Sequence, residues 1–319
     1  MIGAPRVAGT APRLTAPTLA AWLALAVTRG AAGQAPAPAA LDWWSEDSAR
    51  IAFVRAHGVA HAYPHAVIWA PADSLDPAWL SPFADSLAAG LAALQALIEG
   101  PYPWQRIGQR PVVLVFGPGR FVSHATGRDT VLIALTTIQR GRGPFLHEAA
   151  HELLAPPAPF FPFEYPDTLV GEARAARFPF WLSEGLPDLL AQTVVQRTGF
   201  REGDVFEVGG LARVDSTCRA RLSGHPRRAA IAARIGGLGR LEALYTTERG
   251  LVAPAFYACS QSFTKALAER VGIGTLVRLM PEISSGTWIA TLEHAAGATL
   301  PALRRDWLAR LHVPEDEAE

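Results

Sequence analysis

Residues 143–157 read GPFLHEAAHELLAPP, and this stretch determines the structure expected around it. The pair Gly143-Pro144 favours a helix start at this point, because proline is tolerated at the first helical position. The pair Pro156-Pro157 ends that helix about three turns later. Because apolar residues surround the helix on nearly every side, we expect it to be buried. These residues are Phe145, Leu146, Ala149, Ala150, Leu153 and Leu154.

The motif HEAAH at 147–151 places two histidines four residues apart, so both imidazoles leave the same face of the helix. Two neutral imidazoles there can hold one zinc ion, at about 2.0–2.1 Å each. Glu148 lies one residue on, where its carboxylate can take a proton from a water bound to that ion. Ordinary surface histidines are the alternative, but buried polar groups need partners. The motif therefore predicts His147 and His151 as zinc ligands and Glu148 as general base.

A third ligand is expected further along the chain, because a catalytic zinc normally takes three protein ligands and keeps one position open. The metzincin spacing is absent, since Leu154 and Pro157 stand where its glycine and third histidine would be. The segment WLSEGLPD at 181–188 offers Glu184 as the ligand. Asp188, on the same helical face, can accept the second ring N–H of a ligating histidine. The alternative is two solvated acids at a helix start, where the helix dipole favours them.

HEAAH followed by WLSEGLPDLL resembles the gluzincin metallopeptidases of the thermolysin-like and peptidase-MA-like type, which pair HExxH with a downstream W-x-x-E-G helix. The segments YACSQSF at 257–263 and GATLPALRRDWLARL at 297–311 resemble helices that follow the zinc site in that family. The resemblance extends over residues 60–312 and implies a zinc-dependent peptidase. It implies these roles: His147, His151 and Glu184 as zinc ligands, Glu148 as base, and Asp188 as the group that orients a histidine.

Two features depart from the family pattern. The gap between His151 and Glu184 is longer than in the best-known gluzincins, so Asp167 and Glu172 remain alternative third ligands. No G-x-M-E-N segment is present, the element with which gluzincin aminopeptidases bind a free amine. An aminopeptidase of that type is therefore not expected.

The resemblance also suggests where the transition state and the substrate bind. Gluzincins often stabilise the oxyanion with a Tyr or His from the C-terminal part, which makes Tyr257 the first candidate. Tyr245 and His225 are the next candidates, and simple packing within a helix is the alternative for Tyr257. The strand expected at 130–135 would be the edge strand that pairs with the substrate backbone.

Hydrophobic patterns elsewhere in the chain predict an α+β fold. Short apolar runs predict strands at 65–70, 111–116 and 130–135, and helical spacing predicts a helix at 80–100. We expect an N-terminal lobe (46–155) with a small mixed or antiparallel sheet, a mainly helical C-terminal lobe (156–312), and a zinc cleft between them. The expected C-terminal helices span 187–197, 229–235, 261–271, 274–280, 285–296 and 300–311.

The N-terminus has the features of a secretory signal peptide at 1–33, although an Ala-rich tail is the alternative. Its apolar run at 19–27 makes only about 14 Å of helix, too short for a bilayer core of about 30 Å. A flexible Pro/Ala linker is expected at 34–45, and an acidic tail at 313–319. The protein is therefore expected to be periplasmic or extracellular, with no stable membrane anchor after cleavage.

The composition narrows the classes of partner and of site. Among 319 residues, Lys plus Arg and Asp plus Glu each number 29, so the balanced charge gives no support for binding to nucleic acid or anionic membranes. Cys218 and Cys259 form no CxxC pair, which excludes a thiolate zinc site within one chain. Export would allow them to form a disulfide, and two buried free thiols are equally compatible with the sequence.

The sequence thus predicts a zinc-dependent peptidase that acts on a peptide or protein substrate. One alternative is a zinc amide hydrolase that cleaves a cell-wall peptide. The other is a non-catalytic binding protein on a gluzincin fold, and Glu148 argues against it, because a degraded enzyme would more readily lose this base than keep it beside both histidines.

Overall fold

The structure is a computed structural model of the whole chain, and seven stretches of it can be described. They are residues 43–99, 111–126, 130–154, 179–204, 206–236, 249–283 and 286–313. The described residues from Ser45 onward belong to one compact unit. The predicted signal peptide lies outside the described residues, as do Asp167, Glu172, Tyr245 and most of the acidic tail. The last three positions of the predicted linker, 43–45, lie in a helix.

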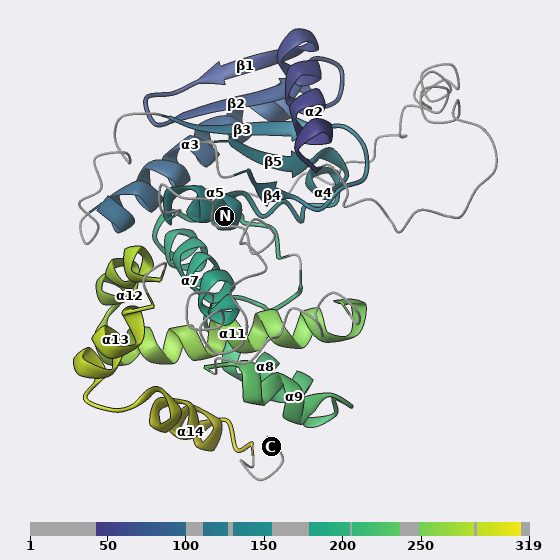
Figure 1. Cartoon of the computed structure of the whole chain (residues 1–319). Helices are drawn as coiled ribbons and strands as arrows, with labels where there is room; N and C mark the ends of the chain where they lie inside the picture. The colour runs from purple at the N-terminus through teal and green to yellow at the C-terminus, as the bar shows by residue number, and fades with distance from the viewer. Residues whose placement is uncertain are drawn as a thin grey trace, which may run out of the picture. The chain divides into compact units, whose positions relative to one another are not determined.

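The described strands form one mixed sheet of five strands, in the order β1-β2-β3-β5-β4 (Figure 1). The inner pairs β2–β3 and β3–β5 are parallel, whereas β1 and β4 pair antiparallel at the two edges. This confirms the predicted α+β class and the mixed sheet. The strands are β1 (Gly58–Ala62), β2 (Ala66–Pro71), β3 (Val112–Gly117), β4 (His124–Ala125) and β5 (Thr130–Ala134).

The prediction that the strand at 130–135 is an edge strand is wrong. β5 lies between β3 and β4, so the two-residue strand β4 forms that edge of the described sheet. All five residues of β5 are buried, which is typical of a strand covered on both faces. The edge strand could not be predicted, because β4 is too short to show an alternating pattern.

Helices cover both faces of the sheet. Side chains along each strand alternate between the two faces, so apolar residues on both faces are buried by helices. Helix α2 (Trp43–His57) packs on one face, where Val54 meets Val115 and Leu132 (Figure 1). On the other face, Leu114 and Ile133 join the large core that α3 (Pro77–Glu99) and α5 (Phe145–Leu154) share. Helix α5 therefore lies between the sheet, where it contacts β3, β4 and β5, and the helix α7 (Phe180–Thr198).

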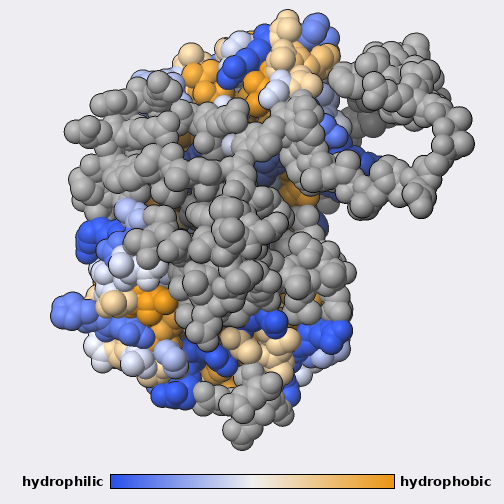
Figure 2. Space-filling model, viewed as in Figure 1, coloured by the Kyte–Doolittle hydropathy of each residue, from blue (hydrophilic) through white to orange (hydrophobic). Residues whose placement is uncertain are grey.

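Helix α3 is the one described helix that is long and apolar enough, by length and composition, to cross a membrane. Its side chains Leu87, Leu91, Leu94 and Ile98 are fully buried in the protein core. On the face shown in Figure 2, hydrophilic and hydrophobic residues are mixed over the described part of the surface. The burial of these four side chains is what a core helix of the α+β unit requires.

The C-terminal half is built around α11 (Arg249–Val271), which packs against α7, α8, α12, α13 and α14. The remaining described helices are α4 (Leu135–Gln139), α7 (Phe180–Thr198), α8 (Val214–Ser223), α9 (Arg228–Arg234), α12 (Ile273–Leu279), the 3-10 helix η1 (Met280–Glu282), α13 (Trp288–Ala296) and α14 (Leu300–Arg310). This half is mainly helical in its described residues, as predicted.

Two predicted helices start earlier than expected. Helix α7 begins at Phe180, where the N–H groups of Leu182 and Ser183 donate to the carbonyl of Pro179. The predicted start at 187 is wrong because proline usually marks the first turn of a helix, whereas Pro187 lies inside α7. Helix α11 begins at Arg249, well before the predicted start at 261, so the segment 257–263 lies inside this helix.

Covalent and polar links hold the C-terminal helices to α11. Cys218 of α8 and Cys259 of α11 form a disulfide, which resolves the two options that the sequence left open. The indole N–H of Trp307 on α14 donates to the hydroxyl of Ser262 at 2.9 Å, in a fully buried position. The two later segments that resemble gluzincin helices are therefore in direct contact.

Candidate metal centre

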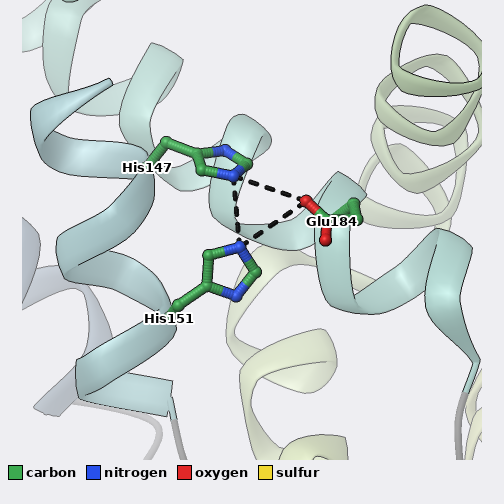
Figure 3. Close-up of side chains that lie close together, drawn as sticks. All are labelled: His147, His151 and Glu184. Carbon is green, nitrogen blue, oxygen red and sulfur yellow. Dashed lines mark hydrogen bonds and ion pairs between the residues drawn. The ribbon is translucent and has the colours of Figure 1, made fainter. Parts of the chain in front are cut away.

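The side chains of His147, His151 and Glu184 converge from two helices, as Figure 3 shows. The two histidines leave α5 on one face, and Glu184 reaches them from α7. The two Nε2 atoms are 3.1 Å apart, and Glu184 Oε2 lies 3.5 Å from that of His147 and 3.6 Å from that of His151. The packing of α7 against α5 thus brings Glu184 to two histidines that are distant from it in sequence.

This triangle has the size that a tetrahedral metal ion requires. Ligand bonds of 2.0–2.1 Å at tetrahedral angles separate neighbouring ligand atoms by about 3.3 Å. The three separations, 3.1, 3.5 and 3.6 Å, lie close to that value. Two imidazoles and one carboxylate suit zinc, although other divalent transition metals accept the same donors. The three residues fit one metal ion with one coordination position left open.

Asp188 holds the ring of His147 through a hydrogen bond. Its Oδ1 lies 2.7 Å from Nδ1 of His147, and a carboxylate can only accept, so Nδ1 carries the hydrogen. In the neutral ring the lone pair is then on Nε2, which faces His151 and Glu184. Asp188 thus orients the ring and selects its tautomer, the arrangement expected beside a metal ligand.

The charges of the cluster influence one another strongly when no ion is bound. Burial acts to lower the pKa of His147, but Asp188 and Glu184 outweigh it and hold the pKa well above its ordinary value. Burial acts to raise the pKa of Glu184, but hydrogen bonds from His147 and His151 hold it below its ordinary value. The metal-free cluster therefore favours the imidazolium form of His147, so a metal ion at Nε2 would compete with a proton there.

Glu148 lies on the side of α5 that faces the sheet edge. It is buried, and its Oε2 accepts the backbone N–H of Ala125 on β4 at 3.1 Å. Burial raises the pKa of Glu148 above its ordinary value, although the two nearby histidines act in the opposite direction. A carboxylate whose affinity for a proton is raised is suited to accept one from a nucleophile.

Tyr257 is the one oxyanion candidate that the structure places beside the cluster among the described residues. Its ring centroid lies 6.4 Å from that of His147, and the ring stacks on Phe206 at 4.1 Å. His225 lies between α8 and α9, where its Nδ1 accepts the backbone N–H of Arg227. The third candidate, Tyr245, lies outside the described residues.

Sequence reasoning did not identify Glu202, which caps the N-terminus of α5. Its two carboxylate oxygens accept the N–H of Leu146 at 2.9 and 3.0 Å, and one of them accepts the N–H of His147 at 3.1 Å. Burial raises the pKa of Glu202 to about 8, while these two N–H groups act in the opposite direction. No local spacing predicts a cap that lies more than fifty residues away, so only the folded chain reveals it.

The backbone after Glu202 lies directly against the start of α5. The N–H of Gly203 donates to the carbonyl of Gly143 at 2.9 Å. A Cβ at Gly203 would come within 2.6 Å of the Arg142 Cα, so only glycine fits this contact. The segment 202–203 therefore fixes the position of the helix that carries both histidines.

We expect Glu202→Ala to destabilise the protein by about 1–3 kcal/mol, because it leaves two N–H groups at a buried helix start without their acceptor. Glu202→Gln keeps a carbonyl oxygen at this position and should cost less. Denaturant unfolding of the metal-free variants measures both effects. Equal stability of Glu202→Ala and the wild type would show that this cap contributes nothing.

No protein-family model, no curated protein and no solved structure matches this chain. Membership of the gluzincin family therefore remains a prediction. It rests on the residues of the two motifs.

Proposed function

We propose that this chain is a zinc-dependent peptidase of the gluzincin type, with zinc held by His147, His151 and Glu184. The observation that carries the proposal is the triangle of ligand atoms from His147, His151 and Glu184. Asp188 is hydrogen-bonded to His147, and Glu148, the next residue on the same helix, contacts the edge strand β4. When bound, zinc would polarise the carbonyl of the scissile bond and make a water molecule easier to deprotonate.

In this proposal, the protein groups move the protons and hold the reactants. Glu148 accepts a proton from the attacking water and then delivers it to the leaving amine. Tyr257, from α11, is the proposed donor to the developing oxyanion. The reaction needs no redox partner, since one C–N bond breaks and the elements of water are added.

The edge strand β4 is the proposed binding site for the backbone of the substrate. It is the open edge of the described sheet on this side, and Ala125 contacts Glu148 directly. An extended peptide that adds to β4 as a further strand would pass next to the proposed base. Strand β4 thus takes the role in substrate binding that was expected for the strand at 130–135, which is the interior strand β5.

The arrangement of lobes and the location belong to the same proposal. The metal centre would lie in a cleft between a sheet-bearing lobe (46–155) and a helical lobe (156–312), since its ligands come from α5 and α7. The disulfide between Cys218 and Cys259 supports an oxidising compartment, in agreement with export by the predicted signal peptide.

Metal analysis and a peptide library test the proposal. The protein from residue 34 onward should bind one zinc ion per chain and cleave peptides, and a chelator should abolish cleavage until zinc is restored. His151→Ala should lose zinc, whereas His294→Ala, which changes an exposed histidine on α13, should keep both zinc and activity. Absence of zinc would refute the metal centre. Zinc without cleavage of any library would favour a binding protein.

Zinc binding is expected to weaken as the pH falls, because zinc and a proton compete for Nε2 of His147. The pKa of His147 is held well above its ordinary value, so the competition extends to a higher pH than for an ordinary histidine. For one displaced proton the dissociation constant should rise by about tenfold per pH unit. Competition with a chromophoric chelator between pH 6 and pH 8 measures this slope. A constant that does not change with pH would contradict the assigned protonation.

A further inference from the structure

The ring of His124, in the edge strand β4, is held between two hydrogen-bond acceptors. Its Nδ1 lies 2.8 Å from the carbonyl oxygen of Val122, and its Nε2 lies 2.8 Å from Oδ2 of Asp47 on α2. The side chain is 23% exposed, and that of Asp47 is 6% exposed. The contact therefore joins β4, at the edge of the sheet, to α2, which packs on the face of the sheet opposite to α5. The position is mostly buried.

The two acceptors determine the charge of the ring. A carbonyl and a carboxylate only accept, so both ring nitrogens must carry hydrogen, and only the imidazolium form of His124 has both. Burial acts to lower the pKa of His124, but the hydrogen bonds to Asp47 and Val122 outweigh it and raise the pKa above its ordinary value. The geometry and the electrostatics thus agree on a positively charged ring.

Further charged and aromatic groups surround this pair. Arg50 of α2 donates to the other oxygen of Asp47 at 3.2 Å and lies over the ring of Phe121 at 4.7 Å. Phe121 meets the His124 ring edge-to-face. From α5, the carboxylate of Glu148 interacts electrostatically with His124. Within the part of the chain that the structure describes, Asp47, Arg50 and Glu148 are therefore the charged groups that face the imidazolium.

The contact of the His124 ring with Asp47 and Val122, called the anchor below, adds to a short backbone pairing between β4 and β5. The strand has two residues, and its ladder to β5 consists of the pairs His124↔Leu132 and Ala125↔Val131. So short a ladder provides little stability by itself. Ala125, the residue after His124, donates its N–H to Glu148. A shift of His124 would therefore move the N–H group that holds the proposed base.

We propose that His124 is a positioning residue of the reaction. As an imidazolium held between Asp47 and Val122, it fixes the edge strand that orients Glu148 and binds the substrate backbone. This inference rests on the proposed peptidase function for its catalytic consequence, but the anchor itself is a property of the free protein. The anchor is complete when the ring is charged and is lost as the pH rises through the raised pKa, because one ring nitrogen then has no hydrogen to donate.

Nitrogen-15 NMR of the histidine rings in the zinc-loaded protein tests the anchor without any substrate. We expect both ring nitrogens of His124 to be protonated at pH 6, with a titration above the ordinary histidine value. Asp47→Asn should lower that titration. A neutral ring at pH 6 would overturn the inference, and so would a titration that Asp47→Asn leaves unchanged.

The consequence for substrate binding is tested with His124→Gln. We expect KM for an extended peptide to rise by about tenfold, which corresponds to the loss of one charge-assisted hydrogen bond. We expect kcat to fall as well, because the N–H of Ala125 holds Glu148 less firmly, and zinc content to stay unchanged. In the wild type KM should rise at alkaline pH, and this rise should be absent from the variant. The matched control is His61→Gln, which changes a histidine on β1 at the other edge of the sheet. A KM and a pH profile equal to those of the wild type would overturn the inference.

Amide hydrogen exchange separates failure of this inference from failure of the proposed function. If the wild type cleaves no peptide, the peptidase proposal fails. His124→Gln and Asp47→Asn should nevertheless both speed the exchange of the Ala125 and Thr126 amides. Unchanged exchange in both variants would overturn the anchor, whether or not the protein is a peptidase.

Discussion

The Glu148→Gln protein is expected to keep one zinc ion per chain and to lose peptide hydrolysis by about 10²–10⁴ in kcat, the usual contribution of a general base. The amide has the size of the carboxylate and can still accept the N–H of Ala125, so the fold around α5 should not change. It cannot accept a proton from water. Single-turnover kinetics with a peptide found in the library screen, together with metal analysis, measures both properties.

Glu269→Gln is the matched control for this experiment. Glu269 is a carboxylate on α11 whose partners are Lys265 and Arg310, on the surface. Its change should leave both zinc content and kcat as in the wild type. If Glu148→Gln retains full activity, Glu148 is not the base. If it loses zinc as well as activity, the residue has a role in holding the site that the proposal does not include.

Gly185→Ala is expected to disturb the metal centre, although glycine has no side chain with which to contact a metal ligand. A Cβ at residue 185 would lie 2.6 Å from the backbone oxygen of Ser260 and 2.8 Å from its carbonyl carbon, and would also collide with the Thr264 hydroxyl. Because two of these atoms belong to the backbone of α11, no side-chain rotation relieves the contact. Helices α7 and α11 must therefore separate.

The separation should affect both stability and function. Overpacking of this kind costs about 1–3 kcal/mol. Glu184, the adjacent residue, moves with α7, and a displacement of about 1 Å at a site can cost about 100-fold in rate. We expect a lower denaturation midpoint, weaker zinc binding and reduced hydrolysis. Thr264→Ala should not rescue the variant, because the clash with Ser260 remains.

Gly224→Ala is the control for Gly185→Ala. Residue 224 has a φ of −109°, which any residue adopts. A Cβ there would meet no atom within 4 Å. Its stability and zinc affinity should equal those of the wild type. If Gly185→Ala also behaves as the wild type, close contact between α7 and α11 is not what places Glu184.

Local patterns were sufficient to predict the elements that have a strong period. The helical spacing at 80–100 and the apolar runs at 111–116 and 130–135 correspond to α3, β3 and β5. Helix α2, strand β1 and helix α8 were not predicted, because none carries a strong periodic or apolar signal. β4 was missed for a different reason, since its two residues are defined only by their pairing with β5.

The sequence by itself determined that His147 and His151 share one face of a buried helix and that Glu148 follows the first of them. These relations depend only on the helical period and on apolar neighbours within one turn. Tertiary structure decided the remainder: that Glu184 and Asp188 reach those histidines, that Glu202 caps their helix, and that His124 anchors the strand beside Glu148. Each of these contacts joins segments more than twenty residues apart. They form only when the apolar faces of sheet and helices pack together, and no local spacing encodes that packing.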